Sequence, residues 1–253
     1  MFPPTRSRFS ADDRGRKGMS GWTLKRFWTR ATAEPAEGGF AVLLDGRRVK
    51  TPAKAPLIVP TQALAKAIAA EWDAQTGEVR PDTMPLTRTA NSAIDKLSVQ
   101  QAEVVDLLAE YGGTDLLCYR AEAPQALAAR QAAGWDPLLD WAATALSAPL
   151  AVGGGIIPVA QPAASLAALR SQVAALSTFR LAAFHDLVAI PGSLVLALAL
   201  INRRVTAEEA WSLGRIDEDW QAELWGTDEE AAETAALRKA AFFDAHRFYE
   251  LCR

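Results

Sequence analysis

The chain has 253 residues, of which 50% are hydrophobic and 23% are charged, and its net charge is −3. This composition is typical of a globular protein with a sizeable core, and the negative charge argues against a general nucleic-acid binder. Two cysteines and two histidines supply neither a disulfide framework nor a set of metal ligands, so we expect a reducing compartment and no bound metal. The longest apolar run, residues 187–201, is shorter than the roughly twenty residues of a membrane span, which predicts a buried core helix and no membrane insertion.

Charge is unevenly distributed along the sequence. Residues 1–54 carry twelve Lys or Arg against five Asp or Glu, whereas residues 208–233 carry ten Asp or Glu against one Arg. Such asymmetry either steers a partner or holds two parts of one molecule together. Both alternatives remain open from the sequence alone.

The N-terminal part is predicted to contain short strands. Residues 1–21 show little periodicity and no apolar secretory core, so we expect a disordered arm there. Asp45-Gly46 is a strong hairpin-turn signal between two strand-like runs. The expected extended segments begin at Phe27 and continue at residues 40–44, 47–51 and 57–59.

Helices dominate the rest of the chain. Thr61 is predicted to cap a helix whose Leu64, Ile68 and Trp72 lie on one face. Residues 84–97 are read as a short extended piece that runs into a helix. Further helices are expected at residues 98–111, 124–146, 165–175, 177–190, 193–201, 206–224 and 228–251. Those from residue 165 onward each open on a capping Ser, Thr or Asp, and Thr206 with Glu209 is predicted to form a capping box.

Strands followed by helices predict an α+β fold. We expect a small, β-rich α/β domain at residues 22–97 and a larger, all-helical C-terminal domain at residues 98–253.

The segment 211–230, with the sequence WSLGRIDEDWQAELWGTDEE, contains three tryptophans and seven carboxylates. If it is one helix, its core stripe consists of Leu213, Ile216, Trp220 and Leu224. The roughly opposite side of the helix then carries Trp211, Glu218 and Trp225, which recur at seven-residue spacing, together with Arg215 and Ala222. This second side is either covered by the same chain or kept for another protein.

Catalytic motifs are not evident in the sequence. The glycine loop Gly153–Gly155 is not followed by the Lys and Ser/Thr of a phosphate-binding loop. His185 and Asp186 are adjacent, but His246 is the only other histidine available as a metal ligand. Cys118 has no local base and is read as a small buried hydrophobe. A metal- or nucleotide-dependent enzyme that uses the glycine loop and the His185-Asp186 pair is the rival to a binding protein without cofactors.

A series of short motifs extends from about residue 24 to residue 250. In chain order they are Lys25-Arg-Phe-Trp28, Leu44-Asp-Gly-Arg47, Lys50-Thr-Pro52, Glu71-Trp72 with Gln75, Met84-Pro-Leu-Thr87, Ile94-Asp95, Thr114-Asp-Leu-Leu-Cys-Tyr-Arg120, Trp135-Asp-Pro137, Trp211-Ser-Leu213, Asp219-Trp-Gln221 and Trp225-Gly226. Together they resemble the assembly chaperones that hold the alpha subunit of F-type ATP synthase before the catalytic sector is built.

The resemblance implies a non-enzymatic, ATP-independent chaperone that covers the beta-facing surface of the free alpha subunit. It further implies an alphaproteobacterial, cytoplasmic protein, or one in the mitochondrial matrix if the source is eukaryotic, and we expect a monomer. The family's acidic position maps to the group Asp217, Glu218 and Asp219, among which helix geometry favours Glu218. The expected partner-binding set adds Trp211, Trp225 and Arg215, and the expected secondary or structural set is Trp72, Asp95 and Arg47.

Overall fold

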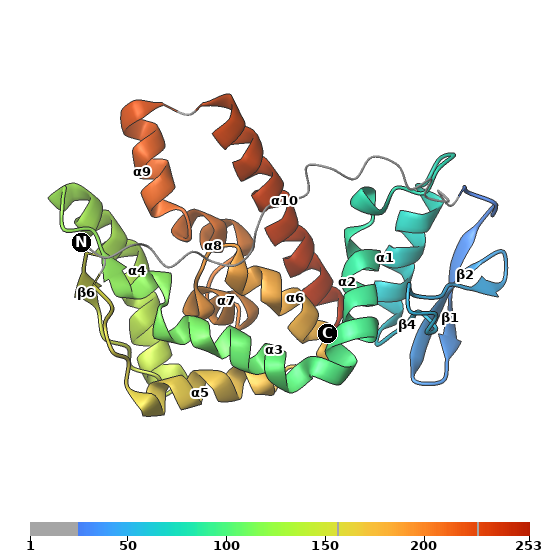
Figure 1. Cartoon of the computed structure of the whole chain (residues 1–253), viewed down its shortest axis with the longest axis horizontal. Coiled ribbons are helices and arrows are strands. Elements are labelled where there is room, and N and C mark those ends of the chain that lie inside the picture. The colour runs from blue at the N-terminus through green and yellow to red at the C-terminus, as the bar shows by residue number, and fades with distance from the viewer. Residues whose placement is uncertain (1–24, 156, 227) are drawn as a thin grey trace, which may run out of the picture.

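An antiparallel sheet forms one end of the molecule, on the right in Figure 1. The computed structural model describes residues 25–155, 157–226 and 228–253, so the arm expected at residues 1–21 lies outside the described residues. The central strand is β2, and one of its edges pairs with β1 while the other is shared by β3 and β4. The strand bounds are β1 Ala31–Ala36, β2 Gly39–Leu44, β3 Arg47–Arg48 and β4 Ile58–Val59.

The predicted turn at Asp45-Gly46 is confirmed, because it joins β2 to β3. The first extended segment begins at Ala31 instead of Phe27, and it forms a hairpin with β2 that the sequence did not predict. Pro35 obscures this strand in the sequence, yet it is tolerated because β1 is an edge strand. The sheet is therefore built around one more hairpin than expected.

Helix α1 (Gln62–Asp73) packs against β1 and β2. The Thr61 side chain accepts a hydrogen bond from the Leu64 amide at 3.1 Å, so the predicted cap is confirmed. Leu64, Ile68 and Trp72 are buried on the predicted face. Trp72 makes an edge-on contact with Trp28, with ring centroids 5.3 Å apart, which fixes the segment before β1 against the helix.

A continuous helical run follows, although a short extended piece was expected at its start. It consists of the 3-10 turn η1 (Pro81–Thr83), α2 (Pro85–Ser92), the π-helical turn η2 (Ala93–Leu97) and α3 (Ser98–Glu110). The carboxylate of Glu71 accepts the Leu86 and Thr87 amides at 2.7 and 2.8 Å and so caps α2. This cap comes from α1, 15 residues away in sequence, and a local pattern does not reveal it. The domain boundary expected near residue 97 falls inside this run and stays a prediction.

In the rest of the chain, α4, α6 and α8 pack against α7, which is buried along its whole length. The elements in this part of the chain are η3 Tyr111–Gly113, η4 Leu116–Cys118, β5 Tyr119–Arg120, α4 Gln125–Ala145, β6 Gly153–Gly154, α5 Ala163–Ala174, α6 Thr178–Ala189, α7 Leu194–Ile201, α8 Ala207–Leu213, α9 Ile216–Trp225 and α10 Glu229–Leu251. The α+β fold with a mostly helical C-terminal part is confirmed. Of the helices described, not one has the length and apolarity needed to cross a membrane.

The long helix α10 links the two ends of the molecule (Figure 1). It packs against α6 and α8 and reaches α1 and α2 beside the sheet. Its N-terminus, capped by Asp228, follows directly on α9. The sheet end and the acidic segment are thus connected through one rigid element.

The single helix expected at residues 206–224 is wrong, because α8 ends at Leu213 and α9 begins at Ile216. Arg215 leaves helical geometry, with φ −127° and ψ 15°. A Cβ at Gly214 would lie 2.8 Å from Pro191 Cβ, and Trp135 Nε1 donates to the Leu213 carbonyl at 2.8 Å. These contacts come from distant parts of the chain and break the helix. Consequently, the seven-residue spacing of the tryptophans does not define one helix face.

Candidate functional site

Polar side chains attach α9 to α4. Arg130 on α4 makes two hydrogen bonds to the Glu223 carboxylate, both 2.8 Å, and its guanidinium lies 4.7 Å from the centroid of the Trp220 ring. The Arg130 hydrogen bonds hold the pKa of the Glu223 carboxyl below its usual range. Gln131, which is buried, donates to Asp217 at 2.6 Å and accepts from the Ala121 amide. One side of α9 is therefore occupied by contacts with α4.

Apolar packing supports the same side of α9. Ile216 is the only residue of α9 that is fully buried, and it lies with Leu213 against Gly134, where a Cβ would come within 3.0 Å of both side chains. Leu213 and Trp220 are half-buried against the core, as expected. Leu224 is 57% exposed, so its predicted place in the core stripe is wrong.

The opposite side of α9 faces α10 across an open groove of about 630 Å³. Figure 1 shows the two helices rising from the body as separate arms. Gly226 ends α9 with φ 81° and ψ 169°, a conformation that essentially only glycine adopts. The wall from α9 contains Glu218, Gln221, Ala222 and Trp225, and the wall from α10 contains Ala231, Thr234, Ala235 and Arg238.

Unpaired negative charge is concentrated around this groove. Residues 216–237 contain eight carboxylates and no Lys or Arg. Asp217, Asp219 and Glu223 have the partners Gln131, Arg215 and Arg130. The other five carboxylates form no ion pair with any described residue: Glu218, Asp228, Glu229, Glu230 and Glu233.

Two of the six residues expected to bind a partner are open to solvent. Glu218 is exposed and lines the groove, and Trp225 is 78% exposed at the groove's outer end. Asp219 instead pairs with Arg215 at 3.3 Å. Trp211 is half-buried beside Phe242 of α10, with ring centroids 5.9 Å apart, and Arg215 lies over its ring. The second face of the acidic segment is therefore partly covered by its own chain and partly open.

The three residues expected to have secondary or structural roles lie elsewhere, toward the sheet end of the molecule. Trp72 is buried against Trp28. Asp95, in the π-helical turn, accepts the Ala53 amide at 3.0 Å and so ties the loop after β3 to the helical run. Arg47 is exposed on β3. The structure does not bring these side chains to the groove.

Known proteins with the same fold decide the family. Atp12 from Paracoccus denitrificans and an aspartate-to-lysine mutant of it are each 55% identical to this chain, with TM-scores of 0.88 over 90% of this chain and 98% of theirs. The chain belongs to the Atp12 family of chaperones. A family model described as ATP12 chaperone protein matches residues 25–143. The resemblance to the chaperones of F-type ATP synthase assembly is thereby confirmed.

Two further relatives of this Atp12-family chain extend the comparison. A solved protein from Agrobacterium tumefaciens is 42% identical, with a TM-score of 0.87 over 90% of this chain and 86% of that one. The mitochondrial protein atp12 of Schizosaccharomyces pombe is 28% identical over 224 residues, which are 83% of this chain and 77% of that protein. The close structural relatives are thus bacterial, and a more distant one is mitochondrial.

The features that the rival enzyme interpretation combines lie in different parts of this Atp12-family chain. Gly153 and Gly154 form β6, which pairs with β5 at the edge of the molecule (Figure 1). His185, on α6, hydrogen-bonds Asp186 at 2.9 Å, and that contact raises the pKa of the imidazole. In the described parts of the chain, no three His, Cys, Asp or Glu residues are grouped to hold a metal ion.

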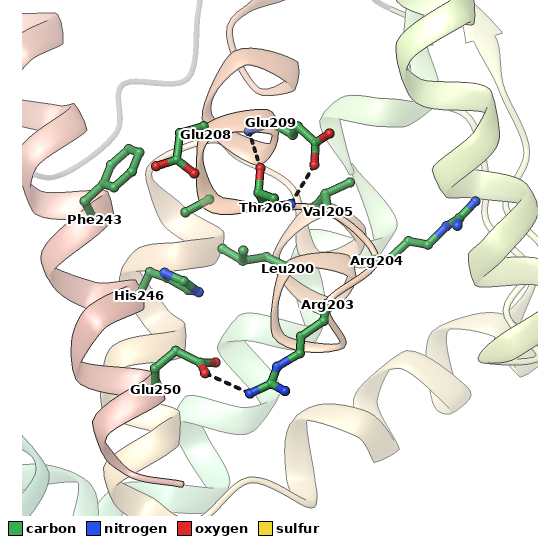
Figure 2. Close-up of a pocket in the computed structure, with 11 residues that line it drawn as sticks. Leu200, Arg203, Arg204, Val205, Thr206, Glu208, Glu209, Phe243, His246 and Glu250 are labelled. Atoms are coloured by element: carbon green, nitrogen blue, oxygen red, sulfur yellow. Dashed lines mark hydrogen bonds and ion pairs between the residues drawn. The ribbon is translucent and has the colours of Figure 1, made fainter. Parts of the chain in front are cut away.

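Another hollow, of about 420 Å³, lies between α7, α8 and α10 (Figure 2). His246 and Phe243 of α10 face Leu200 across it, and Arg203 pairs with Glu250 at 3.2 Å below them. Burial lowers the pKa of His246. The one hydroxyl in its lining, from Thr206, is used to cap α8 in the predicted box with Glu209. Four polar side chains of the lining, Arg203, Thr206, Glu209 and Glu250, are thus engaged in contacts within the protein.

Sequence reasoning missed the α10 wall of the groove and the α4 residues that hold α9. The α10 residues Ala231, Ala235 and Arg238 are spaced at i, i+4 and i+7, which is the signal of a shared helix face. Arg130 and Gln131 gave no such signal, because their partners lie about 90 residues later.

Proposed function

We propose that this chain is a non-enzymatic, ATP-independent chaperone that binds the free alpha subunit of F-type ATP synthase and covers its beta-facing surface until assembly. The observation that carries the proposal is the open side of α9, where Glu218 and Trp225 border an acidic groove. The membership in the Atp12 family supports the chaperone activity, and the geometry supports this surface as the place where the client binds.

The chemistry of this surface suits transient binding. Exposed tryptophans are frequent energetic centres of protein interfaces, and Trp225 is 78% exposed. Unpaired carboxylates accelerate the encounter with a positively charged surface, and they also select against acidic partners. Such a site captures a client through one aromatic anchor and its surrounding charge, without a nucleotide.

We assign different tasks to the six residues of the partner-binding set. Glu218 and Trp225 contact the client, because they are exposed on the groove. Arg215 and Asp219 form an ion pair at its inner end, and Asp217 is bound to Gln131, so these residues position α9. Trp211, on α8, packs beside Phe242 of α10 and beneath Arg215, so it holds in place the segment that leads into α9.

Charge reversal on full-length protein tests the proposal. Glu218→Lys is expected to leave the thermal unfolding temperature unchanged and to reduce co-purification with the co-expressed cognate alpha subunit by at least tenfold. Glu103→Lys is the matched control, because Glu103 is likewise exposed on a helix and lies outside the groove. Equal capture by folded Glu218→Lys and Glu103→Lys variants would contradict the proposed site, and no capture by the wild-type protein would contradict the proposed function.

We further propose a monomer that acts in the bacterial cytoplasm, or in the mitochondrial matrix if the source is eukaryotic. A free alpha subunit is present where the synthase subunits are made, before they reach the membrane. Light scattering of the pure protein tests the monomer, and fractionation of cells tests the compartment.

A further inference from the structure

We infer that the groove between α9 and α10 receives a helix of the client that is amphipathic and carries Lys or Arg side chains on its polar flank. This inference rests on the proposed function. It adds the secondary structure and the charge of the client segment, and it makes α10 a second wall of the binding site.

The walls of the groove favour a helical occupant. Both walls are helices, whose backbone N–H and C=O groups are already bonded within each helix. A segment that binds as a β-strand needs backbone partners from a sheet edge, and these walls offer none. A helix satisfies its own backbone and can therefore lie in a groove lined by side chains without leaving buried polar groups unpaired.

Small side chains leave space for such a helix. The lining contains Ala222 on the α9 wall and Ala231, Thr234 and Ala235 on the α10 wall. Small residues permit the close approach of two helix backbones, which pack with their axes about 8–10 Å apart. Trp225 at the outer end then covers one flank of the inserted helix.

The charges around the groove determine the polar flank of the occupant. Glu218, Asp219, Asp228 and Glu230 line the groove from its inner to its outer end. The two cations in the lining are both engaged. Arg215 binds Asp219 and lies over the Trp211 ring, whereas Arg238 donates to the Ile190 carbonyl. The lining therefore holds four carboxylates against two guanidinium groups, a net charge of −2, which complements Lys or Arg.

Site-specific photo-crosslinking in the full chain tests this inference. A benzophenone amino acid replaces Ala235, on the α10 wall, or Leu237, which is 74% exposed on α10 and does not line the groove. Each protein is co-expressed with the cognate alpha subunit, irradiated and analysed by mass spectrometry. We expect position 235 to label one segment of the alpha subunit that is helical in that subunit and has Lys or Arg at i and i+3 or i+4, with at least fivefold less labelling from position 237.

Steric blocking gives an independent measurement. Ala235→Trp is expected to reduce capture of the alpha subunit at least tenfold, whereas Leu237→Trp leaves capture within twofold of the wild type. Capture with no crosslink from position 235, or a crosslink to a strand, to an acidic segment or to residues 1–24 of the chain itself, would overturn the helix-in-groove inference and leave the proposed function intact. A wild-type protein that captures no alpha subunit overturns both.

Discussion

Replacement of Trp225 by alanine separates client binding from stability. A tryptophan buries about 200 Å² when it is fully covered, and 78% of Trp225 is still exposed, so about 160 Å² is available to a client. At about 25 cal/mol per Å² this area corresponds to about 4 kcal/mol. Ordering and desolvation on association leave about 1–3 kcal/mol, which weakens binding about 5- to 150-fold when the side chain is removed.

Trp211→Ala is the matched comparison in the same segment. Trp211 packs beside Phe242 and beneath Arg215, so its loss is expected to lower the free energy of unfolding by about 2 kcal/mol, below the range for a fully buried aromatic because it is half-buried. Trp225→Ala is expected to change the free energy of unfolding by less than about 0.5 kcal/mol, as surface substitutions do.

Two measurements on the purified variants check this reasoning. Urea unfolding gives the free energy of unfolding, and titration calorimetry with purified alpha subunit gives the dissociation constant. A folded Trp225→Ala protein that binds the client as tightly as the wild type would refute the assignment of Trp225 as an anchor. A large loss of stability in that variant would refute the exposed position of Trp225, from which the expected loss of binding free energy was calculated.

Three further predictions concern the scaffold of the site. Gly134→Ala places a Cβ 2.8 Å from the Leu213 side chain. The overpacking costs about 1–3 kcal/mol of stability, which the higher helix propensity of alanine offsets only in part, so the midpoint of urea unfolding should fall. Burial raises the pKa of both Cys118 and Cys252 to about 12, so neither thiol should react with a disulfide reagent at pH 8 until urea unfolds the chain. Burial also raises the pKa of Glu71. The contribution of Glu71 to the free energy of unfolding should therefore fall as the pH rises above about 4.5. Urea unfolding of the wild type and of Glu71→Gln from pH 4 to 7 should show the difference between their free energies of unfolding falling in the same way.

Local patterns predicted the elements that depend on local physics. Thr61 caps α1, Asp228 caps α10, and Thr206 forms a capping box with Glu209, each through contacts within three residues. The core face of α1 and the burial of Cys118 follow equally from sequence spacing and residue type. The order of strands and then helices was sufficient for the fold class.

Elements that depend on distant contacts could not be predicted in this way. The start of α2 depends on Glu71, and the break after α8 depends on Pro191 and Trp135. A helix through residues 206–224 satisfies the local propensities of that segment, and only tertiary packing excludes it. The acidic segment was thus recognised correctly as unusual, but the face assigned to it combined residues from two helices.

The way α9 is held explains why its other side remains open. A helix of 10 residues is not stable by itself in water, so contacts with the rest of the chain must order it. Those contacts are on the α4 side, through the ion pair and stacking of Arg130, the hydrogen bond of Gln131 and the burial of Ile216. They leave Glu218 and Trp225 free of any structural task. A short helix anchored on one side and charged on the other presents a rigid surface at low entropic cost of binding, which is the property that a capture site for an unassembled subunit requires.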